Sequence, residues 1–240
     1  TKPRIDLVYR SLSEAEADAL AELLSPHETV GGRWAFNPTL EELSLRNFGE
    51  PNDSSHAVLR ALRPRQDADG GWSASEALSC VRLRGNVGPK AAEALAELLS
   101  PRQSPNDGSA VPVSAIRVLC IQDCPEFGDS GAEALARALS PVSDGSGGRI
   151  WASSLGYLLL GRSGVGPRGA EALLQALRWR ERESDAETVN TSLLQIDLTD
   201  NELSETCLKD LQRAADAINS ARENQQCKWP LTVLPSRIDS

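Results

Sequence analysis

The strongest constraint on the fold is a repeat of nearly constant length. Six short leucine-rich segments recur along the 240-residue chain. The last apolar residue of each segment lies 38 or 39 residues after the previous one, at Leu7, Leu45, Leu83, Ile121, Leu160 and Leu198. Such a period indicates one supersecondary unit copied along the chain, whose copies stack because a single copy cannot bury its own apolar faces.

Each unit reads as a strand followed by a helix. In segment 40–45, alternation sends Leu43 and Leu45 to one side of a strand and the polar residues to the other. Near copies of one helical sequence, with apolar residues three and four positions apart, occupy residues 88–101, 128–141 and 166–179. Strands joined through helices form parallel sheets with right-handed crossovers. The helix is therefore repeated because each copy buries the flank of the next.

The strand segments resemble the consensus of leucine-rich repeats, L-x-x-L-x-L-x-x-N/C-x-L. The matching residues are Leu78, Val81, Leu83 and Asn86; Ile116, Leu119, Ile121 and Cys124; and Leu193, Ile196, Leu198, Asn201 and Leu203. The helical wording Gly-Ala-Glu-Ala-Leu is similar to the ribonuclease-inhibitor-like class, and the resemblance covers residues 4–219. It implies an α/β fold, a leucine-rich repeat solenoid forming a curved horseshoe segment. That segment has about six strand–helix repeats of 38 residues, with a parallel concave sheet and outer helices.

The sequence also departs from this family. The Asn/Cys position holds Arg10, Phe48 and Ser163 in the other units. The unit is about 10 residues longer than the 20–29 residues typical of these repeats. The extra residues fall between each helix and the next strand, where a longer surface loop costs little closure entropy.

Tryptophans follow glycines in three of these insertions, at Trp34, Trp72 and Trp151. We expect them to pin the long loops against the end of the solenoid, since a buried tryptophan readily orders a glycine-rich loop. The alternative is an aromatic ridge that serves function.

Two regions are expected along the chain. Residues 1–219 form the leucine-rich repeat domain, and residues 220–240 form a C-terminal extended cap or a linker, because the tail leaves the repeat and contains prolines. The sequence contains no Met, even at position 1, which favours a segment of a longer protein.

The register of the repeats predicts which side chains share the concave face. Neighbouring strands lie about 4.8 Å apart, so Cys80, Val118, Cys120, Tyr157 and Leu159 would form one apolar patch. Arg46, Arg82 and Arg84 would border it, with Glu41 and Glu42 as candidate internal counter-ions. An aromatic and aliphatic centre with an arginine rim is typical of protein-binding hot spots. The predicted partner-binding residues are therefore Arg46, Arg82, Arg84, Val118, Cys120, Tyr157 and Leu159; isolated exposed hydrophobes or loops folded over the patch are the alternative.

Composition disfavours several other classes of protein. A formal net charge of −9 argues against nucleic acid or anionic lipid as a partner. No apolar run approaches the roughly 20 residues that span a bilayer. Five cysteines without a secretory signal predict reduced thiols and a cytoplasmic location, with cytoskeletal, ciliary or flagellar assemblies as narrower possibilities.

No pattern predicts a catalytic, cofactor or metal site. Cys120 and Cys124 lack the second pair of ligands that a zinc site needs. The two histidines, His27 and His56, have no nucleophile linked to them in sequence. We therefore expect no cofactor and no small-molecule substrate.

The functional prediction is a non-catalytic protein-interaction scaffold that binds a partner through the concave face. We expect the protein to be a subunit of a larger assembly. The resemblance implies cytoskeletal and axonemal assemblies as examples, because known members of the class have such roles. The alternative is a GTPase-activating protein resembling the Ran-directed leucine-rich repeat activators, although no long acidic tail is evident. Another enzyme class is the third possibility.

Overall fold

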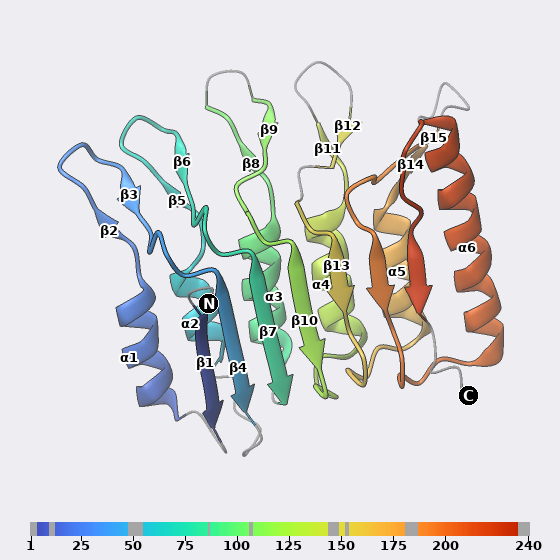
Figure 1. Cartoon of the computed structure of the whole chain (residues 1–240), viewed down its shortest axis with the longest axis horizontal. Helices are drawn as coiled ribbons and strands as arrows, with labels where there is room; N and C mark the ends of the chain where they lie inside the picture. Colours follow the sequence, from blue (N-terminus) through green and yellow to red (C-terminus); the bar gives the residue numbers. More distant parts are fainter. Residues whose placement is uncertain are drawn as a thin grey trace.

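A computed structural model describes residues 4–9, 13–47, 55–85, 87–105, 108–143, 149–151, 154–180 and 187–234. Within these ranges, one main sheet carries the helices on a single side, and small hairpins project from one end of the sheet (Figure 1). The expected α/β class is confirmed.

The main sheet consists of seven parallel strands whose order in space is their order in the sequence. They are β1 (Arg4–Tyr9), β4 (Glu42–Asn47), β7 (Cys80–Gly85), β10 (Val118–Gln122), β13 (Tyr157–Leu159), β16 (Gln195–Asp197) and β17 (Thr232–Leu234). In the first six strands each residue pairs with the one 38 or 39 positions later, as in the series Glu42, Cys80, Val118, Tyr157 and Gln195. The predicted parallel pairing and its register are confirmed.

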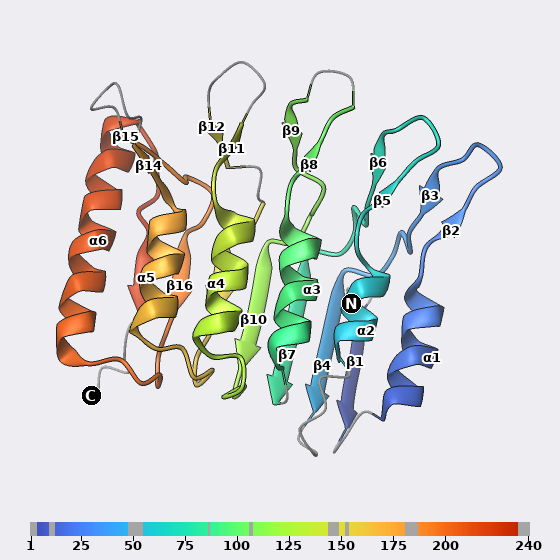
Figure 2. The same ribbon diagram turned by 180° about the vertical axis from the view of Figure 1, so that it is seen from behind.

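Six helices lie side by side behind the sheet (Figure 2). They are α1 (Glu14–Leu24), α2 (Ser55–Ala61), α3 (Pro89–Leu99), α4 (Gly128–Leu139), α5 (Pro167–Ala176) and α6 (Glu205–Asn224). Proline suits the first turn of α3 and α5, because the N–H that it lacks has no partner within the helix there. Among the described helices, none combines the length and the apolar character needed to cross a membrane.

The core is one continuous layer between the sheet and the helices. Units two to six each supply a strand residue that is at most 1% exposed: Leu43, Val81, Leu119, Leu158 and Ile196. From the other side, Leu95, Leu135 and Leu173 of the helices are equally buried. The layer is continuous because adjacent units share it, and this satisfies the apolar faces that a single unit would expose.

The insertions that the sequence analysis treated as loops form antiparallel hairpins. They pair β2 (His27–Glu28) with β3 (Trp34–Ala35), β5 (Arg65–Gln66) with β6 (Trp72–Ser73), β8 (Arg102–Gln103) with β9 (Ala110–Val111), β11 (Val142–Ser143) with β12 (Arg149–Ile150), and β14 (Arg178–Arg180) with β15 (Glu187–Val189). Each hairpin follows one of the helices α1 to α5, so that the hairpins stand in a row (Figure 1).

Tryptophans join neighbouring hairpins. The indole N–H of Trp34 donates to the backbone oxygen of Gln66 at 3.0 Å, and that of Trp72 donates to the oxygen of Gln103 at 3.1 Å. The guanidinium carbon of Arg102 lies 5.3 Å from the centroid of the Trp72 ring, within the range of a cation–π contact. The indole N–H of Trp151 donates to the oxygen of Ala176, at the end of α5. The tryptophans thus pin the insertions by linking one unit to the next.

The C-terminal segment continues the architecture past position 219. Helix α6 runs without a break to Asn224, and the chain then returns to place β17 beside β16. The side-chain amide of Asn219 accepts from the N–H of Leu231 at 2.7 Å and donates to its oxygen at 3.0 Å. The last helix therefore holds the last strand against the edge of the sheet.

Candidate functional site

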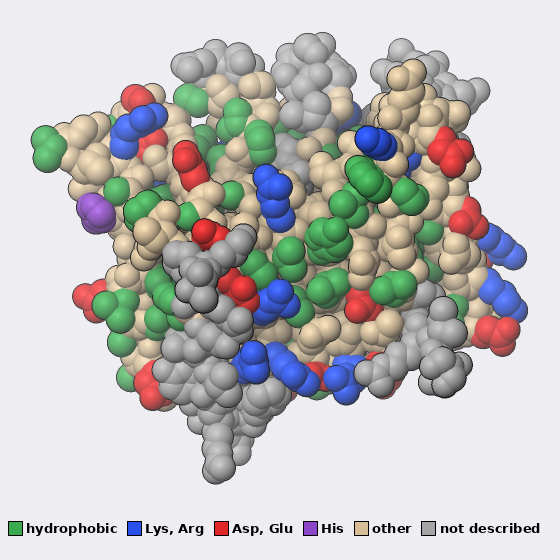
Figure 3. Space-filling model, viewed as in Figure 1, with side chains coloured by type: hydrophobic (Ala, Val, Ile, Leu, Met, Phe, Trp, Pro, Cys, Tyr) green, Lys and Arg blue, Asp and Glu red, His purple; other side chains and the backbone are tan. Residues whose placement is uncertain are grey.

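The face of the main sheet opposite the helices, here called the open face, carries the predicted contact residues. Hydrophobic side chains gather over its middle, and Lys and Arg side chains lie along its lower part (Figure 3). The strand pairing places Val118 between Cys80 and Tyr157, and Cys120 between Arg82 and Leu159. Arg46 pairs with Arg84 one row further along. All seven predicted residues therefore belong to one contiguous area.

Fewer apolar residues are exposed in this area than the sequence predicts. Tyr157 is 41% exposed, and Val118 and Leu159 are half-buried, but Cys80 and Cys120 are buried. Register tells which way a side chain points, but a short side chain between longer neighbours is still covered. Burial raises the pKa of the Cys120 thiol, and the nearby Arg82 guanidinium partly opposes this. Cys120 thus contributes little contact surface, which corrects its predicted role.

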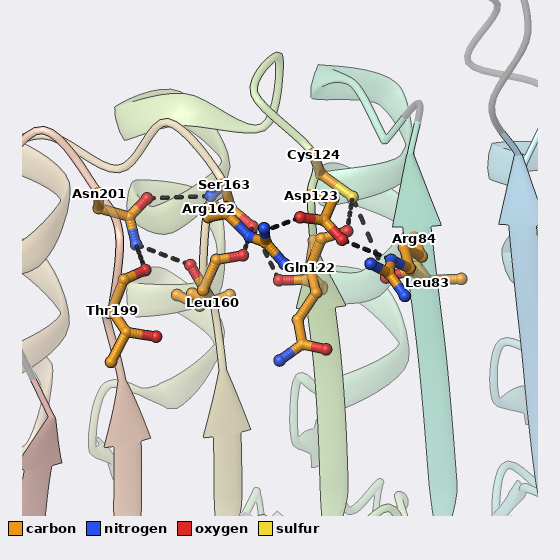
Figure 4. Close-up of polar contacts among 12 residues, drawn as sticks. Leu83, Arg84, Gln122, Asp123, Cys124, Leu160, Arg162, Ser163, Thr199 and Asn201 are labelled. Atoms are coloured by element: carbon orange, nitrogen blue, oxygen red, sulfur yellow. Dashed lines mark hydrogen bonds and ion pairs between the residues drawn. The ribbon is translucent and has the colours of Figure 1, made fainter. Parts of the chain in front are cut away.

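Three arginines on the open face are paired with acidic side chains from neighbouring units. Nε of Arg82 lies 3.0 Å from Oε1 of Glu42, so the expected counter-ion Glu42 does act within the sheet. Arg84 pairs with Asp123, which follows β10. The same Asp123 carboxylate lies 2.7 Å from Nε of Arg162 (Figure 4). Two guanidinium groups therefore share one carboxylate at this edge.

These arginines remain accessible despite their partners. The side chains of Arg82, Arg84 and Arg162 are 46%, 45% and 54% exposed. Arg162 was not predicted as a site residue, although its position 39 residues after Asp123 places both in equivalent turns. Asp123 and Arg162 both have φ 54°, a left-handed turn that directs the two side chains along the strand ends. The three side chains are therefore within reach of a partner that contacts this edge.

Small polar side chains support the turns beneath this edge. Asn201 accepts from the N–H groups of Ser163 and Val165 at 3.0 and 2.9 Å, and it donates to the oxygen of Leu160 at 2.8 Å. The Ser163 hydroxyl donates to the oxygen of Ile121 at 2.8 Å (Figure 4). Ser163, a departure from the repeat consensus, therefore has the same role as the asparagine. The other two departures, Arg10 and Phe48, and the consensus residue Asn86 lie outside the described residues.

Cys124 occupies the equivalent position one unit earlier. Its thiol donates to the oxygen of Gln122 at 3.1 Å, and burial raises its pKa to about 12. A thiol with this pKa stays protonated at neutral pH and is a poor metal ligand. In the part of the chain that the structure describes, no group of three or more His, Cys, Asp or Glu side chains could hold a metal ion.

A groove of about 600 Å³ adjoins the open face, between the first hairpins and the strand starts. Its lining includes Trp34, Phe36, Trp72, Pro112 and Val113. These residues were not predicted to form a surface together, because they come from insertions that carry no strand or helix periodicity. In the sequence, only the tryptophans that follow glycines indicated that these insertions are ordered. The groove also has polar lining residues, among them Arg33, Asn37 and Glu76, so it adds a mixed polar and apolar surface beside the sheet.

The sequence matches no protein-family model. The curated proteins contain no match to it either. The assignment of the site therefore depends on the geometry of this chain alone.

Proposed function

We propose that this chain is a leucine-rich repeat protein of the ribonuclease-inhibitor-like class, which binds a partner protein through its open face. The 38-residue period, the parallel strand order and the polar residues at the strand ends support the repeat assignment. In such a solenoid the open face is the concave surface, and stacked units offer a continuous contact area.

The observation that carries the proposal is the contiguous arrangement of Tyr157, Val118 and Leu159 beside half-exposed arginines. Tyrosine and arginine are the residue types that contribute most to protein-binding hot spots. Guanidinium groups already oriented by Glu42 and Asp123 lose little side-chain entropy when a partner binds. Affinity would therefore come from the aromatic and aliphatic centre, with the arginines selecting the partner.

A non-catalytic role is part of this proposal. His27 lies on β2 in the first hairpin and His56 on α2 behind the sheet, so neither stands beside the open face. A general acid–base site built on histidine would need such a group within hydrogen-bond reach of a nucleophile. We propose that the protein acts as a subunit of a larger cytoplasmic assembly, with cytoskeletal or ciliary structures as the narrower class.

The test compares partner retention by the purified chain and by a double variant, Tyr157→Ala with Leu159→Ser. Two hot-spot truncations are expected to weaken binding by at least about tenfold. Proteins that co-purify with the chain from its native source are identified by native mass spectrometry and titrated against each variant. Leu23→Ser is the matched control, since Leu23 is 82% exposed on α1, behind the sheet. Unchanged retention by the double variant would remove the open face from consideration.

A further inference from the structure

Two seams between the helices behind the sheet carry an ion pair that involves an equivalent glutamate of the repeat. Oε1 of Glu93 on α3 lies 2.6 Å from Nη2 of Arg137 on α4. Oε1 of Glu133 on α4 lies 2.8 Å from Nη2 of Arg168 on α5. Both glutamates belong to the repeated Glu-Ala-Leu segment of their helix. At each of these two seams, that is, where two neighbouring helices pack together, a glutamate on one helix therefore pairs with an arginine on the next.

This pairing ends at α5. Glu171 is the next equivalent glutamate, but the described residues of α6 give it no cation. Its carboxylate accepts a hydrogen bond from Gln175 of its own helix at 2.8 Å. On α6, the positions of Arg168 and Arg137 hold Thr206 and Arg213, and Arg213 pairs with Asp210 of its own helix. Cys207 and Asp210 line the same groove as Glu171. The last seam thus brings the carboxylates of Glu171 and Asp210 to one groove, and Glu171 has no guanidinium from the next helix among the described residues.

The last seam is also open, unlike the one before it. Between α4 and α5, a Cβ added at Gly169 would lie 2.8 Å from the Cβ of Ala132, so those helices approach closely. Between α5 and α6 lies a groove of about 530 Å³. Leu174, Leu211 and Ala214 supply the apolar part of its lining. This seam therefore has room for a side chain from outside the chain.

Carboxylates surround the Cys207 thiol, which lines this groove. The pKa of the Cys207 thiol is raised by burial first, and then by the charges of Asp210, Glu171 and Asp129. Three carboxylates therefore act on one point of the groove. The ion pair of Asp210 with Arg213, at 2.9 Å, is exposed on both sides and screened by water. Arg178 lines the groove as its basic residue.

We propose that the groove between α5 and α6 binds an arginine-bearing segment of a partner protein. The guanidinium binds between Glu171 and Asp210, and an adjacent aliphatic side chain packs on Leu174, Leu211 and Ala214. This arrangement reproduces from outside the contact that Arg168 makes to Glu133 within the chain. Arginine fits because its planar guanidinium binds carboxylates through paired hydrogen bonds, while its stem packs on apolar surface. The groove lies behind the sheet, so this site is independent of the open face.

The test uses a synthetic alanine-based helical peptide of about 14 residues with Arg and Leu four positions apart. It is titrated into the whole chain carrying ¹³C-labelled leucine methyl groups, observed by NMR. We expect saturable shifts of the Leu174 and Leu211 signals and none of Leu159 on the open face. Replacing the peptide arginine by Glu is expected to weaken binding by about tenfold or more.

Variants of the chain complete the experiment. We expect the double variant Glu171→Gln with Asp210→Asn to bind the Arg peptide about tenfold more weakly. Added salt should also weaken binding of the Arg peptide to the unchanged chain. Asp216→Asn is the matched control, because Asp216 is an exposed carboxylate of α6 that does not line the groove. Unchanged signals of Leu43 and of Leu198, a buried leucine of the last unit, report that each variant is folded.

Four results would overturn the proposal. They are equal binding of the Arg and Glu peptides, no loss of affinity in the double variant, shifts located outside the groove, and no binding of the Arg peptide. Groove signals that move with protein concentration in the absence of peptide would instead assign the groove to a second copy of this chain, and would equally exclude the proposed occupant.

Discussion

Three different side chains perform one task at the ends of the strands. Asn201, Ser163 and Cys124 each donate to a backbone oxygen in the turn where the chain leaves the sheet. Asn201 makes the most contacts, because an amide both donates and accepts. The thiol is the weakest of the three donors. Their contributions to stability should therefore differ although their positions are equivalent.

The variants Asn201→Ala and Ser163→Ala measure this difference. Asn201→Ala leaves the N–H groups of Ser163 and Val165 without their acceptor, so we expect a loss of about 2–3 kcal/mol in the free energy of unfolding. Ser163→Ala removes one donor, and we expect a loss of about 1 kcal/mol. Urea unfolding followed by circular dichroism gives both values. Equal losses would show that the turn does not depend on the amide.

The cysteines make a second prediction at this scale, with a defined dependence on pH. Cys124 has a pKa of about 12 in the fold, above the ordinary value of 9.0. The stability associated with its neutral thiol is therefore present below pH 9 and is lost as pH rises toward 12. We expect the free energy of unfolding to fall over that range, and to fall less in Cys124→Ala.

Thiol labelling checks the same environments at pH 8. Cys207 and Cys227 are partly exposed and should react in the folded protein, whereas the buried Cys80, Cys120 and Cys124 should react only in denaturant. Cys207 should react more slowly than Cys227, because burial and nearby carboxylates raise its thiol pKa. Mass spectrometry of labelled peptides identifies each site. Rapid labelling of Cys124 would contradict the burial of the strand-end turn.

At the scale of elements, the strands were predictable from sequence and the insertions were not. The constant period alone predicts that Cys80, Val118 and Tyr157 are neighbours across the strands, because parallel strands from units of equal length pair in the same register. The hairpin strands, of two or three residues, are too short to show alternation. Cys120 is 5% exposed although its register places it on the open face, because coverage by neighbouring side chains is not encoded in a period. In the described residues, Glu171 bonds Gln175 of its own helix, whereas Glu93 and Glu133 pair with an arginine of the next helix, and only a comparison of the three seams shows this difference.

Contacts between the helices of neighbouring units also cannot be predicted from the sequence of one helix alone. The N-cap of α5 is Gly166, which has no side chain to cap the helix. Oδ1 of Asp129 on α4 accepts instead from the N–H groups of Gly166 and Gly169, at 2.7 and 2.8 Å. A carboxylate there also favours the positive end of the helix dipole. The start of one helix is thus stabilised by the helix before it.

A matched pair of leucines tests how much these neighbours contribute. Leu23 and Leu98 stand at the same place in nearly identical helical segments, yet Leu23 is 82% exposed and Leu98 is 4% exposed. Leu98→Ala should lower the free energy of unfolding by about 2–4 kcal/mol, and Leu23→Ala by less than about 0.5 kcal/mol. Parallel urea titrations give the two values. Similar losses would mean that the seams between helices contribute little.

At the scale of the whole molecule, contacts run mainly between adjacent units. The strand order follows the sequence order, and each helix packs on the next. Such a chain has a stability close to a sum of local and nearest-neighbour contributions. The C-terminal end depends on a buried cation. The guanidinium of Arg222 donates to the backbone oxygens of Asn190 at 2.6 Å, Leu193 at 2.5 Å and Trp229 at 3.2 Å.

Arg222→Met therefore tests whether disruption stays local. The substitution removes the donors that join α6 to the segment before β16 and to the return toward β17, leaving their buried oxygens unpaired. We expect faster amide hydrogen exchange in α6, β16 and β17, with α3 and β7 still protected, because a chain of stacked units opens from its end. Hydrogen-exchange mass spectrometry resolves these segments. Arg213→Ala, which changes an arginine that is 78% exposed on the same helix, should leave every segment protected. Uniform loss of protection from β4 to β17 in Arg222→Met would instead show that the seven-stranded sheet unfolds as one cooperative body.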